Sequence, residues 1–386
     1  MPGVSFGDNG GMTSASHSSA SAEPFEGLRI RGVAKTFGTD TTVLNEIDLD
    51  VHPGELISLV GSSGTGKSTL LRIIAGLEEP SAGRVTYAGQ PLERGSVGVV
   101  FQRPILYPHL SVKDNILFPT RLGAFSGGVD MDYYRELLEA LKLDGLESRK
   151  PSQLSGGQAQ RVGIARALIR RAPVVLFDEP LASVDEEMSA SIRADIVRLH
   201  ERYGFTGLYV THDQNEALML GQRVAVMDAG YLVQVDTPER LLAHPHTLQV
   251  AKLMAAPALN LLALEDSESL PAGCELAIRA TALCLVAADA AHALPVQVLG
   301  SRHLVGGMLY RARLLEAVSL PLESRRASAD SELSARMYAR VRAGQELEFF
   351  IPDAQGGTSL SVGDRVHLGV AAERCFLFSE GKRFYL

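Results

Sequence analysis

The sequence has few of the features that mark secreted, membrane-spanning or nucleic-acid-binding proteins. Its three cysteines, Cys274, Cys284 and Cys375, share no CxxC spacing, so we expect free and mostly buried thiols. No apolar run reaches the roughly 18 to 20 residues that a membrane-spanning helix requires. The net charge of −8 leaves no excess of Lys and Arg to neutralise phosphates, so no nucleic acid is expected as a partner.

Basic residues are missing from residues 1–27, which therefore lack the basic start of a secretory signal and the Arg-rich pattern of a transit peptide. We expect a cytoplasmic protein. The same residues are dominated by Ser, Gly and Ala, and they predict a disordered tail because they cannot bury enough apolar surface to offset the entropy of ordering.

In the rest of the chain, the pattern of apolar and polar residues changes once, near residue 255. In residues 28–254, short β-branched runs alternate with amphipathic segments, which is typical of βα units on a mainly parallel sheet. Residues 104–172 interrupt this pattern with helix-like stretches and predict an inserted helical subdomain. Residues 255–386 contain short alternating runs, such as residues 275–279 and 365–370, separated by Gly, Pro and Asp turns. They predict a C-terminal all-β domain.

A glycine-rich loop follows the near-continuous apolar run at residues 56–60 and precedes an apolar helical run at residues 70–77. Its glycines allow backbone N–H groups to approach phosphates, and the helix N-terminus adds a positive dipole. Lys67 is expected to reach the β- and γ-phosphates, and Ser68 to bind Mg²⁺ through its hydroxyl. The residues expected to bind ATP here are Gly61, Ser62, Ser63, Gly64, Thr65, Gly66, Lys67, Ser68 and Thr69.

Two carboxylates follow a second apolar run, at residues 174–177. Asp178 and Glu179 would then lie at the carboxyl end of a buried strand, where α/β sheets bind their ligands. Asp178 suits the Mg²⁺ shell, and Glu179 suits a general base that polarises water. Alone, the pair could equally be a solvated turn; beside the phosphate loop it predicts nucleotide hydrolysis.

A third motif opens the helix-like stretch at residues 159–169, which places small backbone groups at a helix N-terminus suited to an anion. It is the pentapeptide Leu154, Ser155, Gly156, Gly157 and Gln158. With this motif the chain resembles an ABC-family nucleotide-binding subunit. The resemblance implies an ABC-type P-loop NTPase fold of the α/β class, and an ATPase that uses ATP and Mg²⁺.

Further residues match the family by their order around these motifs. Gln102 resembles the glutamine that senses Mg²⁺ and attacking water and links them to membrane subunits. His212 resembles the histidine that contacts the γ-phosphate. Phe37 resembles the aromatic residue that stacks on adenine, with core packing as the alternative. Asp185 resembles the aspartate at the dimer interface, although Ala182 and Val184 depart from the usual wording around it.

The sequences of residues 71–78 and 106–112 are similar to those of the maltose-type importer ATPases. This group also includes ATPases of iron, polyamine, sulfate and phosphonate importers. The C-terminal segments resemble that group's regulatory β-modules of the oligosaccharide-binding type. Ala280 and Thr281 depart from the group, which usually has Pro-Glu there. The resemblance covers residues 28–386.

For partners, the resemblance implies a second ATPase subunit in a head-to-tail dimer. Ser155 and Gly157 of the Leu154 to Gln158 motif would face the γ-phosphate held by Lys67, Ser68 and Gln102 of the other subunit. It also implies two membrane permeases bound near Gln102 and the residues up to Val112, an extracytoplasmic solute-binding protein, and a position on the inner face of the membrane. The expected solute is a carbohydrate, with iron, polyamine, sulfate or phosphonate as alternatives. An exporter ATPase and an ABC ATPase of DNA repair or translation are the rival interpretations.

Overall fold

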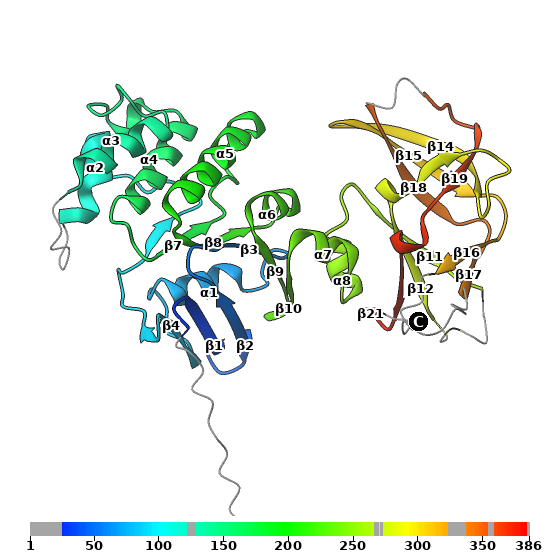
Figure 1. Ribbon diagram of the computed structural model, residues 1–386, viewed down its shortest axis with the longest axis horizontal. Helices are drawn as coiled ribbons and strands as arrows, with labels where there is room; N and C mark the ends of the chain where they lie inside the picture. The colour runs from blue at the N-terminus through cyan, green and yellow to red at the C-terminus, as the bar shows by residue number, and fades with distance from the viewer. Residues whose placement is uncertain are drawn as a thin grey trace, which may run out of the picture.

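The computed structural model describes residues 25–121, 129–265, 270, 273–322, 337–353 and 359–383 (Figure 1). Most of the expected tail lies outside these residues. Phe25, Glu26 and Gly27 do not, and the Gly27 carbonyl accepts a hydrogen bond from the Ala88 N–H at 3.1 Å. Residues 25–27, which were predicted to belong to the tail, are therefore part of the fold. No helix among the described residues is long and apolar enough to cross a membrane.

The centre of the first half is a six-stranded sheet in the order β10-β9-β3-β8-β7-β6. Every neighbouring pair is parallel except β9 and β10, which are antiparallel. The two apolar runs predicted as central strands, residues 56–60 and 174–177, form β3 and β7. Both strands lie inside the sheet, and both runs are buried along their whole length. The strands are β3 (Leu56–Val60), β6 (Gly98–Val100), β7 (Val174–Asp178), β8 (Thr206–Thr211), β9 (Arg223–Asp228) and β10 (Tyr231–Asp236).

The sheet separates two hydrophobic cores, because successive side chains of a strand point to opposite faces. Leu176 and Val210 on one face pack with helix α1 (Lys67–Ile74). Phe177 and Tyr209 on the other face pack with the helices on that side. Those helices are α2 (Val112–Leu117), α3 (Met131–Ala140), α4 (Gly156–Leu168) and α5 (Glu186–Tyr203).

A second sheet covers α1 and was not predicted. Its strands β1 (Leu28–Phe37), β2 (Thr41–Val51), β4 (Ala82–Tyr87) and β5 (Gln90–Pro91) are antiparallel in the order β2-β1-β4-β5. The expectation of βα units from residue 28 onward was therefore wrong for these strands. Only a short turn joins β1 and β2, so these two antiparallel strands form a hairpin.

The described part of residues 104–172 contains α2, α3, α4 and short 3-10 turns, without a strand. Their buried residues belong to one core with α5, which is why this segment forms a layer on the sheet. Helix α5 has a complete set of end signals: Asp185 caps its first turn, and Gly204 ends it in the left-handed conformation with φ 57°. Beyond it lie α6 (Gln214–Leu220), α7 (Pro238–Ala243) and α8 (Leu248–Leu253).

After α8 the described chain contains strands and short 3-10 turns. The sheets have the orders β11-β12-β20-β21, β13-β19-β14-β15-β18 and β16-β17, and all their pairs are antiparallel. Cys274 and Cys375 are buried, and all three cysteines are free, as predicted. The strands are β11 (Leu259–Ala263), β12 (Glu275–Arg279), β13 (Cys284–Val286), β14 (Leu294–Leu304), β15 (Gly307–Leu314), β16 (Val318–Leu322), β17 (Met337–Val341), β18 (Glu346–Pro352), β19 (Arg365–Gly369), β20 (Cys375–Ser379) and β21 (Lys382–Arg383).

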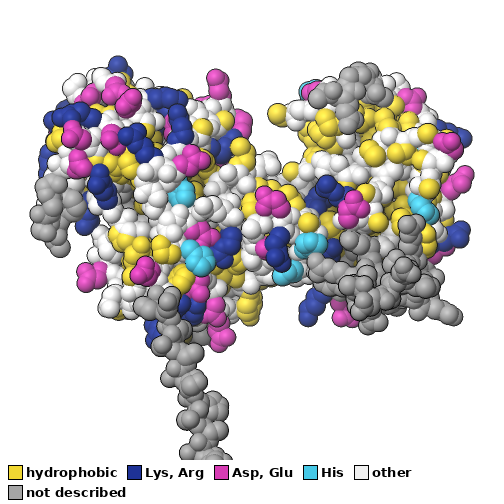
Figure 2. Space-filling view, in the orientation of Figure 1, with side chains coloured by type: hydrophobic (Ala, Val, Ile, Leu, Met, Phe, Trp, Pro, Cys, Tyr) yellow, Lys and Arg dark blue, Asp and Glu magenta, His cyan; other side chains and the backbone are white. Residues whose placement is uncertain are grey.

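The β-rich part is attached to α7 and α8 by polar contacts. The buried guanidinium of Arg279 donates to the carbonyls of Leu242 at 2.7 Å and Met254 at 3.3 Å. The backbone near β21 also bonds to this segment, since the Leu248 N–H donates to the Gly381 carbonyl at 2.8 Å. Figure 2 shows acidic and basic side chains interspersed over both parts of the face in view.

A buried ion pair joins α4 to α5. Arg161 Nη2 lies 2.9 Å from Asp195 Oδ2, and the Asp195 side chain is 0% exposed. The same nitrogen donates to the Ser191 hydroxyl at 2.8 Å. A carboxylate enclosed in this way depends on its cations, because burial of a charge is costly unless it is paired.

We expect Asp195→Ala to lower the free energy of unfolding by about 3 kcal/mol, because it leaves the Arg161 guanidinium buried without its carboxylate. Urea denaturation followed by circular dichroism measures this. Asp132→Ala is the matched control, since Asp132 pairs with Arg135 on the surface, where such pairs contribute little. Equal losses in the two variants would contradict a structural role for the buried pair.

Candidate functional site

The loop between β3 and α1 has a conformation that only glycine adopts readily. Gly64 and Gly66 have φ values of 82° and 98°, in the left-handed region. A Cβ on Gly66 would lie 2.7 Å from Leu44 Cδ2 and 2.8 Å from the Val43 carbonyl oxygen. Gly66 is also the N-cap of α1, and it supplies no side-chain hydrogen bond to the first turn. The first N–H groups of α1 therefore depend on another acceptor, and an anion is well suited to them.

A buried cation lies inside this loop. Lys67 Nζ donates to the carbonyls of Gly61 at 2.8 Å and Ser62 at 2.9 Å. Burial lowers the pKa of Lys67, while the nearby carboxylates of Glu179 and Asp178 oppose that shift. A buried ammonium group beside the N–H groups at the start of α1 suits a polyphosphate, so the loop fits ATP.

Oxygen donors suited to Mg²⁺ lie beside the loop. The Ser68 hydroxyl donates to Asp178 Oδ1 at 3.2 Å. Burial raises the pKa of Asp178, and the hydrogen bond from Ser68 opposes that shift. A carboxylate and a hydroxyl are hard oxygen ligands, which Mg²⁺ binds together with substrate phosphates. The pair therefore fits the metal that ATP requires.

Glu179 and His212 lie together at the carboxyl edge of the sheet. Glu179 is held in the left-handed region at φ 44°, and its N–H donates to the Val210 carbonyl at 3.0 Å. Its Oε2 lies 3.2 Å from Nδ1 of His212. A non-glycine residue in this conformation stores strain, which proteins tend to keep at functional sites. Two residues proposed for the hydrolytic step are thus in direct contact.

Gln102 and Phe37 both occupy exposed positions. Gln102 lies just after β6, and its carbonyl accepts a hydrogen bond from the Ser183 hydroxyl at 3.3 Å. Phe37 ends β1 and is 43% exposed, with Lys35 Nζ 4.9 Å from the centre of its ring. This exposure excludes the core-packing alternative and leaves the ring available to a flat ligand.

The Leu154 to Gln158 motif is not part of this group. It begins α4, whose buried residues pack on the face of the sheet opposite to α1. Ser155 caps α4 by accepting from the Gln158 N–H at 3.2 Å, and Gln158 Oε1 accepts from the Ser155 N–H at 3.0 Å. Leu154 packs against the helical core. Gly157 is buried, and a Cβ at this position would lie only 2.6 Å from Met188 Cγ. Ser155 and Gly156 are the exposed members.

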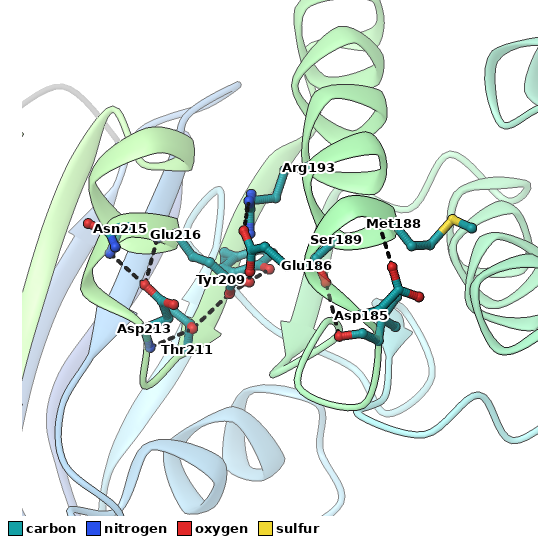
Figure 3. Close-up of polar contacts among 11 residues, drawn as sticks. Asp185, Glu186, Met188, Ser189, Arg193, Tyr209, Thr211, Asp213, Asn215 and Glu216 are labelled. Carbon is teal, nitrogen blue, oxygen red and sulfur yellow. Dashed lines mark hydrogen bonds and ion pairs between the residues drawn. The ribbon is translucent and has the colours of Figure 1, made fainter. Parts of the chain in front are cut away.

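Asp185 also has a structural task in this chain. Its side chain accepts a hydrogen bond from the Met188 N–H at 2.9 Å and so caps α5. The sequence motifs did not identify the buried residues that bond to the turn containing His212, above all Glu216 in the first turn of α6 (Figure 3). The signal for Glu216 was its helical spacing, since it directly precedes Ala217 and lies four residues before Leu220, both buried.

A cavity of about 280 Å³ opens beside the segment that follows Gln102. Ile105 and Tyr107, which are 63% and 39% exposed, contribute to its wall. Arg166 of α4 donates to the Ile105 carbonyl at 2.5 Å and so joins this segment to the helical layer. The surface here is concave and largely apolar.

Comparison with known proteins agrees with the motifs. The family model described as ABC transporter matches residues 44–182. The chain is 45% identical over 241 residues to sn-glycerol-3-phosphate import ATP-binding protein UgpC 1 of Rhizobium johnstonii, covering 61% of this chain and 65% of that protein. It is 43% identical over 266 residues to UgpC of Salmonella typhi, covering 66% and 74%.

Among solved structures, cbiO1 from Clostridium perfringens, part of the ABC transporter complex cbiONQ, matches with a TM-score of 0.51 and 27% identity, over 57% of this chain and 92% of that one. The predicted family, its α/β P-loop fold and its use of ATP and Mg²⁺ are confirmed. The chain belongs to the ABC transporter family of ATP-binding proteins, whose members hydrolyse ATP.

Proposed function

We propose that the chain is the ATP-hydrolysing subunit of an ABC importer and drives solute uptake through separate membrane permeases. The observation that carries this proposal is the similarity to import ATP-binding proteins, which includes 74% of the length of the Salmonella typhi relative. The relatives are named for sn-glycerol-3-phosphate, a phosphorylated polyol. This supports the carbohydrate side of the sequence prediction over iron, polyamine, sulfate and phosphonate.

In this proposal the loop from Gly61 to Thr69 holds the phosphates of ATP, and Phe37 stacks on adenine. Ser68, Asp178 and Gln102 hold Mg²⁺, which neutralises phosphate charge when it is bound. Glu179 takes the proton of the attacking water, and His212, in contact with Glu179, orients that carboxylate and reaches the γ-phosphate. The 3.2 Å contact between the two side chains supports this division of work.

The proposed active form is a head-to-tail dimer. The central sheet lies between α1 and the core of α4, so the Leu154 to Gln158 motif of one subunit would complete the site of the other. The sequence prediction places Ser155 and Gly157 at the phosphate. Because Gly157 is buried and Gln158 is engaged in the cap, we propose Ser155 and Gly156 in their place. Asp185 would lie at the same interface, presenting the start of α5.

The permeases would dock at the cavity beside Gln102. An exposed Ile and Tyr beside a concave wall suit a short amphipathic helix of a membrane subunit. We place the chain on the inner face of the membrane for this reason, with the solute-binding protein acting from the other side. Residues 28–254 would form the ATPase domain and residues 255–386 a regulatory domain.

The general base is tested by Glu179→Gln. We expect turnover to fall by roughly 10²- to 10⁴-fold, because the amide cannot accept the proton of water, while ATP binding is retained. Single-turnover hydrolysis and nucleotide binding by fluorescence measure the two effects. Glu201→Gln, an exposed change of the same kind on α5, is the control. Normal turnover by Glu179→Gln would refute the assignment.

The solute is tested in proteoliposomes that contain the chain, its permeases and the binding protein. We expect ATP-dependent uptake of sn-glycerol-3-phosphate to exceed uptake of maltose, spermidine, sulfate or ferric iron. Preferred uptake of maltose would keep the carbohydrate class and change the solute. Preferred uptake of an inorganic ion or polyamine would refute the class.

The docking surface is tested by Ile105→Glu. A carboxylate at this exposed apolar position should cost about 1 to 3 kcal/mol of binding, and so reduce co-purification with the permeases by roughly tenfold or more. Val305→Glu, at a fully exposed valine between β14 and β15, is the matched control. Co-purification of Ile105→Glu at the level of Val305→Glu would contradict docking at this cavity.

A further inference from the structure

A network of polar side chains, with a buried centre, lies between α5, α6 and the end of β8 (Figure 3). It includes Thr211 and Asp213, the residues on either side of His212 in the sequence. Its centre is Glu216, which is 8% exposed. Glu216 Oε2 accepts a hydrogen bond from the Tyr209 hydroxyl at 3.1 Å and another from the Thr211 hydroxyl at 2.8 Å. A buried carboxylate that has two donors on one oxygen is fixed in position.

This carboxylate holds the backbone on both sides of His212. Thr211, which precedes His212, donates to Glu216 and accepts from the Asp213 N–H at 3.0 Å. Asp213, which follows His212, accepts from the N–H of Asn215 at 2.7 Å and of Glu216 at 3.2 Å. The turn that carries the imidazole is therefore tied to the first turn of α6 through Glu216.

Both donors of the network, the hydroxyls of Tyr209 and Thr211, keep their protons and direct them to Glu216. Burial, with the carboxylate of Glu216 beside it, raises the pKa of Tyr209 well above its usual value, so the phenol keeps its proton and donates. Thr211 has its hydroxyl proton directed to Glu216 because its oxygen accepts from Asp213. Both bonds thus require an acceptor at Oε2.

The other carboxylate oxygen links the turn to α5. Arg193 Nη1 lies 3.4 Å from Glu216 Oε1, and Arg193 Nη2 donates to Glu186 Oε1 at 2.9 Å. Glu186 directly follows Asp185, the cap of α5. Arg193, with only 13% of its side chain exposed, is therefore shared between the turn of His212 and the start of α5.

We propose that Glu216 is a positioning residue for His212, and that Arg193 couples this position to the start of α5 at Asp185. Glu216 acts on catalysis by fixing the turn from which His212 reaches Glu179. Since Asp185 would lie at the dimer interface, the network gives the interface a direct structural route to His212. The first test measures ATP turnover and therefore rests on the proposed function. The second test measures the NMR signals of His212 and does not.

The first test compares ATP turnover of Glu216→Gln with that of wild type. The amide cannot both accept from the hydroxyls of Tyr209 and Thr211 and pair with Arg193, so one side of the network is lost. We expect kcat to fall roughly 10- to 100-fold, as misplaced groups do, with KM for ATP near the wild-type value because the phosphate loop is untouched. Glu201→Gln, the same change at an exposed position near the other end of α5, is the control and keeps wild-type kcat.

A positioning role predicts that the effect depends on His212. In the His212→Ala background, adding Glu216→Gln should lower kcat no further. An unchanged kcat in the single variant, or a full additional loss in the double variant, overturns the proposal. Thr211→Val removes the bridging hydroxyl at nearly constant volume and should show the same dependence, so it decides the matter where Glu216→Gln does not fold.

The second readout is the NMR spectrum of the imidazole of His212, assigned by comparison with His212→Ala. We expect its ring signals to shift in Glu216→Gln and Thr211→Val and to stay in place in Glu201→Gln. Unshifted signals overturn the proposal even where the wild type has no turnover. A wild type without turnover but with the expected shifts counts against the proposed function alone.

Discussion

Burial of the central sheet on both faces is the constraint on which the rest of the structure depends. The side chains of β3, β7 and β8 are committed to one core or the other, so they cannot carry chemistry along their length. The one charged residue of these three strands, Asp178, lies where β7 ends. The loop after Val60, the pair after Phe177 and the turn after Val210 all leave the sheet at its carboxyl edge, and this brings Lys67, Asp178 and Glu179 close enough to interact.

Much of this could be predicted from sequence because the decisive signals are local. The bounds of β3 and β12 agree with the apolar and alternating runs at residues 56–60 and 275–279. The phosphate loop is specified by its glycines, whose backbone conformation other residues resist. The hairpin of β1 and β2 was missed because apolar alternation indicates strands without indicating which strand is the neighbour. The contact of Gly157 with Met188 was also hidden, since it joins the starts of two helices far apart in the chain.

Several polar side chains proposed to lie at the dimer interface already make hydrogen bonds within the single chain. The side chains of Ser155, Gln158 and Asp185 are engaged in helix caps. What they can present to another subunit is therefore a helix end of fixed direction, with its N–H groups and dipole, rather than a mobile side chain. Such a surface is organised before it meets its partner, so little ordering entropy is lost on contact. The network of Glu216 and Arg193 extends the same rigidity to the turn of His212.

The attachment of the β-rich part also sets an order of events during synthesis. The Leu248 N–H bonds to the Gly381 carbonyl, and the Arg383 N–H bonds to the His246 carbonyl, so α8 and the segment before it are completed by residues made more than a hundred positions later. The sheet that carries the phosphate loop is complete once β10 has emerged from the ribosome. The nucleotide-binding half can therefore fold and bind nucleotide before Gly381 and Arg383, which attach the β-rich part to α8, have been translated.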